Sequence, residues 1–105
     1  MNVDIEYLEE FDILTARNLT NKIKFSKRIG NVILDFDFND KTIGAEIINA
    51  SKLFGLTPQN LTAIKKGKII NVLAPDSVMV KIIFPLERPV EYIVNVTEEM
   101  PQLTV

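Results

Sequence analysis

Apolar and polar residues alternate through two stretches of the chain, 31–38 and 41–48, which are separated by Asn39-Asp40. Successive side chains of a β-strand point to opposite faces, so each stretch has one apolar face. The members of these two apolar faces are Val32, Leu34, Phe36 and Phe38 in the first stretch, and Ile43, Ala45 and Ile47 in the second. The pattern predicts a β-hairpin at the centre of the fold.

The register of this hairpin follows from the need to place both apolar faces on one side, because a slip by one residue would expose one of them. A two-residue loop at Asn39-Asp40 meets that need and predicts a type I′ turn. This loop pairs Phe36 with Ile43. It also pairs Leu34 with Ala45.

Further strands are expected on both sides of the hairpin, where β-branched and aromatic residues recur at alternate positions. Before the hairpin they cover Val3–Tyr7, Phe11–Leu19 and Lys24–Ile29, with Phe25 and Ile29 buried in the last of these. A short helix across 8–17 is the alternative for the second stretch, since leucine, glutamate and alanine favour helices. After residue 67 the strands cover Lys68–Leu73, Val78–Phe84 and Val90–Val96.

Two short helices are expected between these groups of strands. The first follows Asn49, which is positioned to cap it, and runs to Phe54. The second follows the cap residue Thr57 and a proline, runs to Lys66 and ends at Gly67.

These elements predict an α+β fold, a mostly antiparallel β-sheet built from hairpins with one or two short central helices packed on one face. We expect residues 1–105 to form a single domain. Within it, hairpins and a short helix occupy 1–54, the second helix 55–67, a three-stranded meander 68–97 and a frayed tail 98–105.

The first half of the chain resembles a known family. The segments VILDFD at 32–37 and IGAEIINASK at 43–52 are similar to small prokaryotic proteins grouped as domain of unknown function 2283. The family's opening pattern is matched by Val3, Tyr7, Glu10, Asp12 and Leu14, and Leu8 and Thr15 depart from it. The resemblance covers residues 1–54 and implies no established activity. Some members are encoded beside small toxin-like proteins, which implies an antitoxin-like, partner-binding role.

Composition excludes much chemistry without naming a function. The chain has no cysteine and no histidine, so disulfides, thiolate nucleophiles, zinc–cysteine sites and histidine-based triads are impossible within one chain. A net charge of −2 gives no electrostatic reason to expect nucleic acid. The sequence lacks a membrane-length apolar run and a signal peptide, so we expect a cytoplasmic protein without a membrane partner. The abundance of Ile, Val, Lys and Glu suits a thermophile.

Acidic residues around the tip of the predicted hairpin are candidate ligands for a cation. Asp35, Asp37, Asn39 and Glu46 have the spacing of positions one, three, five and twelve of a calcium-binding loop. Asp40 replaces the glycine that such a loop needs at position six, and the flanks are strands, which argues against an EF-hand. A weaker calcium site formed by Asp35, Asp37, Asn39 and Asp40 stays open beside the simpler interpretation of a solvated acidic turn.

Acid–base catalysis is a weaker alternative. Glu9, Glu10 and Asp12 cluster near the first predicted turn. Paired carboxylates act as acid and base only when a pocket separates their pKa values, and the sequence predicts no pocket there. We therefore expect no catalytic residues and no enzymatic activity.

The edges of the predicted sheet, and the strand faces that point away from the core, give the clearest indication of function. Basic residues at 22, 24, 27 and 28 indicate either a surface for an anionic partner or an edge strand that lysines protect from pairing. Apolar residues on the second face of the predicted strands exceed what one small core needs, namely Ile33, Ile48, Met79, Ile83 and Ile93. We expect a sheet edge or such a face to bind a protein, most simply a second copy in a homodimer. The leading hypothesis is a non-enzymatic protein–protein interaction module.

Overall fold

The computed structural model describes residues 1–97 and 100–104. Within them the strands are β1 (Asn2–Leu8), β2 (Ile13–Arg17), β3 (Phe25–Ile29), β4 (Val32–Phe36), β5 (Thr42–Ile48), β6 (Lys66–Ala74), β7 (Ser77–Phe84), β8 (Val90–Asn95) and β9 (Met100–Thr104). The helices are the 3₁₀ turn η1 (Glu9–Phe11) and the α-helices α1 (Ala50–Phe54) and α2 (Pro58–Thr62). The strands form one sheet in the order β3-β4-β5-β2-β1-β6-β7-β8-β9, and neighbouring strands are antiparallel. The predicted α+β class with a mostly antiparallel sheet is confirmed.

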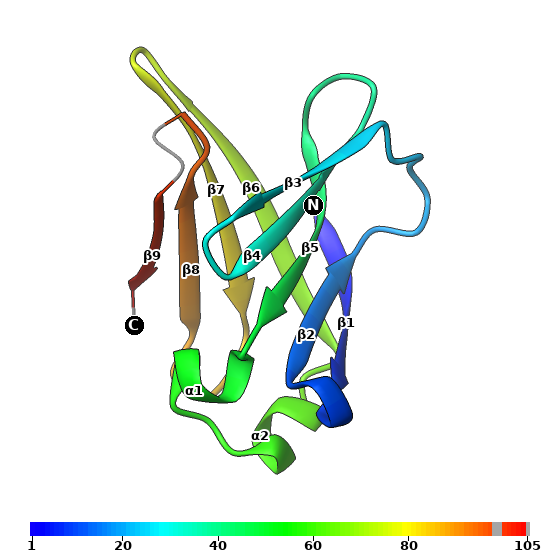
Figure 1. Cartoon of the computed structure of the whole chain (residues 1–105), viewed down its shortest axis with the longest axis vertical. Helices are drawn as coiled ribbons and strands as arrows, with labels where there is room; N and C mark the ends of the chain where they lie inside the picture. The colour runs from blue at the N-terminus through cyan, green and yellow to red at the C-terminus, as the bar shows by residue number, and fades with distance from the viewer. Residues whose placement is uncertain (98–99, 105) are drawn as a thin grey trace.

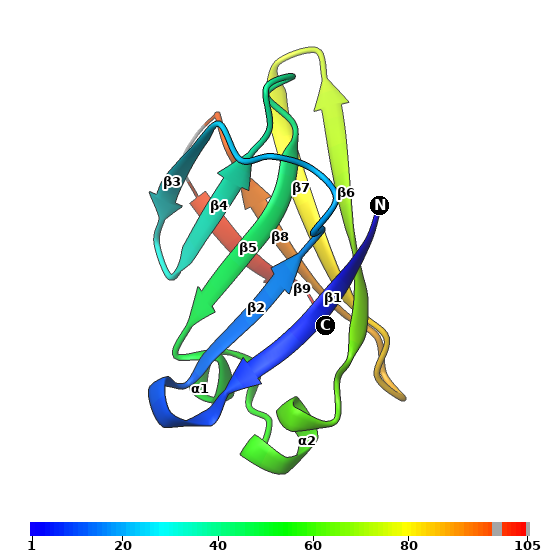
Figure 2. The ribbon, with the colours of Figure 1, turned by 90° about the vertical axis from the view of Figure 1, so that its right-hand side faces the viewer.

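The sheet folds over on itself, so that its first five strands lie across β6–β9 (Figures 1 and 2). The core lies between these two layers and takes residues from both. Its fully buried members include Leu34, Ala45 and Ile47 from the first layer and Val80, Ile82 and Val94 from the second. Apolar faces of two sheets packed against each other account for the alternation of buried and exposed positions along each strand.

Gly67 allows the sheet to bend where β1 meets β6. The two strands share only a short ladder, in which Val3 pairs with Gly67. A Cβ atom on Gly67 would lie 2.8 Å from the Ile83 carbonyl oxygen and 3.1 Å from Ile5 Cδ1. A larger residue would therefore push the two layers apart at this corner.

The two α-helices lie together at one end of the layers (Figures 1 and 2). Phe54 of α1 makes edge contacts with the rings of Phe84 and Tyr92, at centroid distances of 5.4 and 5.8 Å. The predicted end of α2 at Lys66 is wrong, because the helix ends at Thr62. The Ile5 amide donates to the Lys65 carbonyl at 2.8 Å, which draws this segment into β6 instead of a further helical turn.

The central hairpin forms as β4 and β5, with the predicted pairing of Leu34 and Ala45. The predicted pairing of Phe36 with Ile43 is wrong, because Phe36 pairs with Thr42 next to a β-bulge. The bulge adds one residue to β5 and reverses the alternation beyond it. Ile43 is buried, but it lines a hollow on the outer face with Asp35 instead of joining the core cluster.

The turn of this hairpin also differs from the predicted two-residue loop. The Asp37 amide donates to the Lys41 carbonyl at 2.9 Å, so the loop contains the three residues 38–40. Asp40 has the positive φ, at 60°, as in three-residue loops that end in the left-handed conformation. Phe38 lies in the loop and is 67% exposed, so its predicted place in the core is wrong.

The edges of the sheet are β3 and, within the described residues, β9. The prediction that the lysine-rich strand is an edge strand is confirmed. Its Phe25 stacks on Phe36 at a centroid distance of 4.7 Å but stays 42% exposed, contrary to the predicted burial. The predicted frayed tail is wrong for Met100–Thr104, which pair with β8, whereas residues 98, 99 and 105 lie outside the described residues.

Candidate functional site

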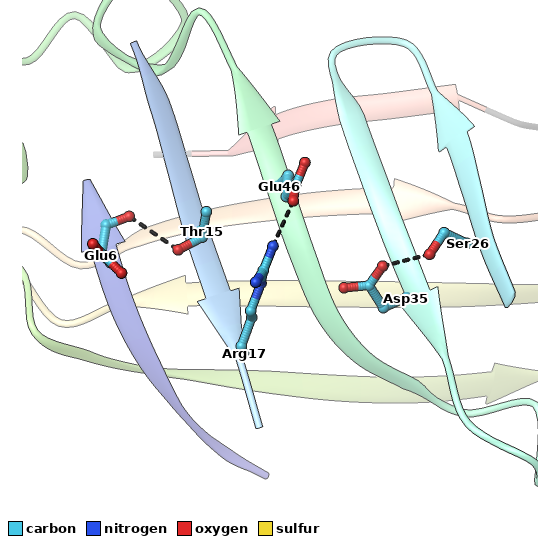
Figure 3. Close-up of polar contacts among 6 residues, drawn as sticks. All are labelled: Glu6, Thr15, Arg17, Ser26, Asp35 and Glu46. Carbon is cyan, nitrogen blue, oxygen red and sulfur yellow. Dashed lines mark hydrogen bonds and ion pairs between the residues drawn. The ribbon is translucent and has the colours of Figure 1, made fainter. Parts of the chain in front are cut away.

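The outer face of the first layer carries a set of polar contacts between neighbouring strands (Figure 3). Arg17 of β2 reaches Glu46 of β5, with 2.5 Å between Nη2 and Oε1. Thr15 donates to the Glu6 carbonyl at 3.2 Å. These contacts tie β1, β2 and β5 together on a face that is open to solvent, and exposed ion pairs of this kind contribute little stability.

Asp35 is a charged residue that is buried on this face, with only 7% of its surface exposed. Its Oδ1 accepts a hydrogen bond of 2.6 Å from Ser26 Oγ on β3. On its other side Asp35 pairs with Gly44 of β5, which offers no side chain. A small hollow of about 160 Å³ lies there, between these strands and the segment 17–23.

The side chains of Asp37 and Asp40, two further predicted cation ligands, form hydrogen bonds and an ion pair at the hairpin loop. Asp37 Oδ1 accepts hydrogen bonds from the amides of Asn39 and Lys41, at 2.8 and 3.0 Å. Asp40 forms an exposed ion pair with Lys24, at 3.5 Å. Within residues 1–97 and 100–104, no three acidic side chains converge as metal ligands. The calcium site stays a prediction that this geometry does not support.

A hydrogen-bonded network that the sequence analysis missed joins the first turn to α1. Tyr7 Oη donates to Asp12 Oδ1 at 2.6 Å, and the Ser51 amide donates to the same oxygen at 3.0 Å. Ser51 Oγ donates to Asp12 Oδ2 at 2.7 Å, and the Ala50 amide donates to the Asp12 carbonyl at 3.1 Å. Asp12 therefore caps α1 across the fold. Asn49 makes no side-chain cap, so its predicted role is wrong.

The network sets the pKa values of its two titratable members. The hydrogen bond to Asp12, followed by burial and by the charges of Asp12 and Glu9, raises the pKa of Tyr7 to about 12. Burial alone would raise the pKa of Asp12, but hydrogen bonds from Tyr7 and Ser51 outweigh burial and hold that pKa below its usual value. Asp12 is thus a structural acceptor, while Glu9 and Glu10 are exposed on η1.

The outer face of β6–β8 carries several apolar side chains that are at least partly exposed. Its outward positions form three rows across the strands: Val72, Met79 and Asn95; Ile70, Lys81 and Ile93; and Lys68, Ile83 and Glu91. Ile70 is 39% exposed, and the other apolar members are partly exposed. We call the apolar members, Ile70, Val72, Met79, Ile83 and Ile93, the β6–β8 patch.

An open hollow of about 670 Å³ extends this patch toward the bend of the sheet. Ile70 and Ile83 line it together with two prolines of the β7–β8 loop, and Lys66 and Lys68 lie at its side. The hollow is thus mainly apolar with basic neighbours. Three of the five residues whose apolar exposure the sequence indicated, Met79, Ile83 and Ile93, belong to the patch.

None of the helices in the described residues is long and apolar enough to cross a membrane.

Comparison with known proteins gives one relative and no assigned function. No family model matches the chain, so the resemblance to domain of unknown function 2283 stays a prediction. No solved structure matches it. A stretch of 61 residues, 58% of the chain, is 38% identical to the uncharacterized protein MJ0789 of Methanocaldococcus jannaschii, a thermophilic archaeon. The chain spans about half of the length of this relative, 53%.

Proposed function

We propose that this protein is a non-enzymatic protein-interaction module, and that the β6–β8 patch binds a second copy of the chain. The observation that carries the proposal is the set of five apolar side chains on a sheet face that nothing in the described chain covers. An antiparallel sheet with one solvated face has polar residues there. A contiguous apolar face is typical of an interaction site.

The size of the face fits a weak dimer. At about 3.4 Å per residue and 4.8 Å per strand, strands β6, β7 and β8, with nine, eight and six residues, present a face of roughly 375 Å². Two such faces together bury about 750 Å², which is below the size of a standard interface and in the range of weak, transient encounters. The proposed dimer should therefore dissociate on dilution.

The charges that flank the patch complement each other across a two-fold axis. Lys68 on β6 and Glu91 on β8 lie in one row, on either side of Ile83. An axis that runs along β7 would place Lys68 of one copy opposite Glu91 of the other. Such an arrangement is isologous, because each copy contributes the same surface.

Lys81 opposes this association. It lies on β7 between Ile70 and Ile93, so the same axis brings the two Lys81 side chains close together. Like charges at the centre of an interface weaken it. The dimer should therefore strengthen when this one charge is removed, which is a result that a purely structural role of the patch does not predict.

Sedimentation velocity from micromolar to millimolar concentration tests the proposal. The natural chain should shift from monomer toward dimer as concentration rises. Ile93→Asp should remain a monomer throughout, because the proposed axis places its carboxylate against the apolar Ile70 of the other copy. Lys81→Met should dimerise at about tenfold lower concentration, equivalent to about 1.4 kcal/mol.

The matched control is Ile33→Asp, a substitution of the same kind on the outer face of β4, where Ile33 is also partly exposed. It should leave the dimer unchanged. Monomer mass for the natural chain at millimolar concentration, or equal effects of Ile33→Asp and Ile93→Asp, would exclude the proposed interface. The antitoxin-like role implied by the resemblance concerns residues 1–54 and stays a separate prediction.

A further inference from the structure

Asp35 combines burial with an unused acceptor. It is 7% exposed, and Ser26 donates to its Oδ1. No residue in the described part of the chain donates to its Oδ2. In the described part of the chain Oδ2 is not one of the fully buried atoms that lack a partner, so it is reached from the hollow beside it and can accept from an outside donor.

The Oδ2 atom of Asp35 faces Gly44 on the neighbouring strand β5, and glycine has no side chain. Gly44 pairs with Asp35, and a Cβ atom at Gly44 would lie 2.8 Å from Asp35 Oδ2 and 3.3 Å from the Ala16 carbonyl oxygen. In Figure 3 the Asp35 carboxylate lies between β5 and Ser26 of β3, with one oxygen turned toward β5. Glycine at position 44 therefore keeps open the space in front of Oδ2.

The hollow of about 160 Å³ occupies this space. Asp35 lines it together with the polar loop residues Asn18 and Asn21. Leu19 and Ile23 also line it, and they are 78% and 53% exposed. A small site lined by a carboxylate and by exposed apolar side chains fits a ligand with a cationic end and an aliphatic stem.

The nearby guanidinium of Arg17 is not the cation that pairs with Asp35. Arg17 lines the same hollow, but its guanidinium is paired with Glu46. A divalent metal is a poor fit, because calcium takes about six to eight oxygen ligands and a single carboxylate converges here. A primary ammonium group needs only a few acceptors and has the compact charge that the space admits.

We propose that the hollow beside Asp35 is a binding site for a primary ammonium group on an aliphatic stem, as in a lysine side chain. Asp35 Oδ2 accepts from the ammonium, and Leu19 and Ile23 contact the stem. The ligand is either a lysine of a partner protein or a free alkylamine, which share this chemistry. The site lies on the opposite layer from the β6–β8 patch, so it is independent of the proposed dimer.

Titration followed by amide chemical shifts in ¹H–¹⁵N spectra tests the site directly. The probes are Nα-acetyl-lysine amide, the uncharged Nα-acetyl-norleucine amide and butylamine. The lysine amide should shift the amides of Ser26, Asp35 and Gly44 in a saturable manner, and the norleucine amide should not. Butylamine binding as tightly as the lysine amide indicates a free amine as the ligand, whereas tighter binding of the lysine amide indicates a partner's lysine.

Two variants separate binding from folding. Asp35→Asn keeps the shape and an acceptor for Ser26, and it should weaken lysine amide binding about tenfold or more, as expected for the loss of a charge-assisted hydrogen bond. Leu19→Ser lies in an exposed loop and should weaken binding by a smaller factor without changing the melting temperature. Asp40→Asn removes an exposed charge elsewhere on the layer and should change nothing. Equal binding of lysine and norleucine amides, unchanged binding by Asp35→Asn, or no saturable shift would overturn the proposal.

Discussion

Asp12 offers the sharpest test of how the turn after β1 is held against α1. It accepts hydrogen bonds from Tyr7 and from the backbone and side chain of Ser51, which is 39 residues away in sequence. It also adopts a left-handed conformation, with φ at 52°. Substitution by alanine removes the acceptors and leaves a residue that disfavours this conformation.

The expected cost can be estimated from these contacts. The two hydrogen bonds from Ser51 contribute about 1 kcal/mol each, and alanine in the left-handed region costs about 1 kcal/mol or more. Asp12→Ala should therefore lower the free energy of unfolding by about 3 kcal/mol, a large part of the roughly 5–15 kcal/mol typical of a domain. Asp12→Asn should cost about 1 kcal/mol, since asparagine tolerates the conformation and keeps one oxygen acceptor.

The stability that Asp12 contributes should decrease in acid. The pKa of Asp12 is lower in the folded protein than its ordinary value of 3.8, so its stabilising effect is present above that value. The effect is lost as the pH falls through the folded pKa. The stability difference between the natural chain and Asp12→Asn should thus shrink in acid. Urea unfolding followed by circular dichroism at neutral and acidic pH measures this difference.

Tyr7 provides a second readout of the same network. The chain has two tyrosines and no tryptophan, so phenolate absorbance reports on Tyr7 and Tyr92 alone. Asp12→Asn should lower the pKa of Tyr7 from about 12 toward 10, while burial keeps the pKa of Tyr92 raised. The stabilisation linked to Tyr7 is present below its ordinary pKa and is lost as the pH rises through about 12. An unchanged Tyr7 titration, or equal destabilisation at both pH values, would refute the assigned network.

Other substitutions test the bend and the contact between layers. Gly67→Ala should destabilise the fold by about 3 kcal/mol in urea unfolding, because its Cβ would meet the Ile83 carbonyl at 2.8 Å. A cost below that of an ordinary surface change would contradict the close approach at the bend. Asn71→Ala should cost about 2 kcal/mol, since the Asn71 amide bonds both the amide and the carbonyl of Thr42, at 2.9 and 3.1 Å. Thr42→Val should be neutral or stabilising by up to about 1 kcal/mol, because the buried Thr42 hydroxyl has no hydrogen-bond partner among the described residues. A marked loss of stability in Thr42→Val would show that the hydroxyl is satisfied.

The alternation of apolar residues predicted the central hairpin correctly as far as Asp35 and failed where a bulge intervenes. Ile33 pairs with Glu46 and Asp35 with Gly44, as parity requires. Beyond them, the extra residue in β5 turns Ile43 to the outer face. Binary patterning assumes an unbroken period of two, so it cannot locate a residue that the bulge adds to one strand.

The missed features of the candidate sites depend on contacts between distant parts of the chain. Asp12 caps α1 because the turn after β1 lies beside that helix, which no local pattern indicates. The spacing of Asp35 to other acidic residues predicts only a cation ligand. Its place beside Gly44 and the hollow depends on the pairing of β4 with β5 and on the nearby segment 17–23. The glycine that the hairpin register places opposite Asp35 is the signal that a sequence argument can use.

The most direct test of the interaction module is an isotope-filtered nuclear Overhauser experiment on an equal mixture of labelled and unlabelled chains at millimolar concentration. We predict contacts between copies among the methyl groups of Ile70, Ile83 and Ile93. Contacts between copies that arise only from the β3 edge, or the absence of any such contact in a sample whose mass shows a dimer, would contradict association through the outer face of β6–β8.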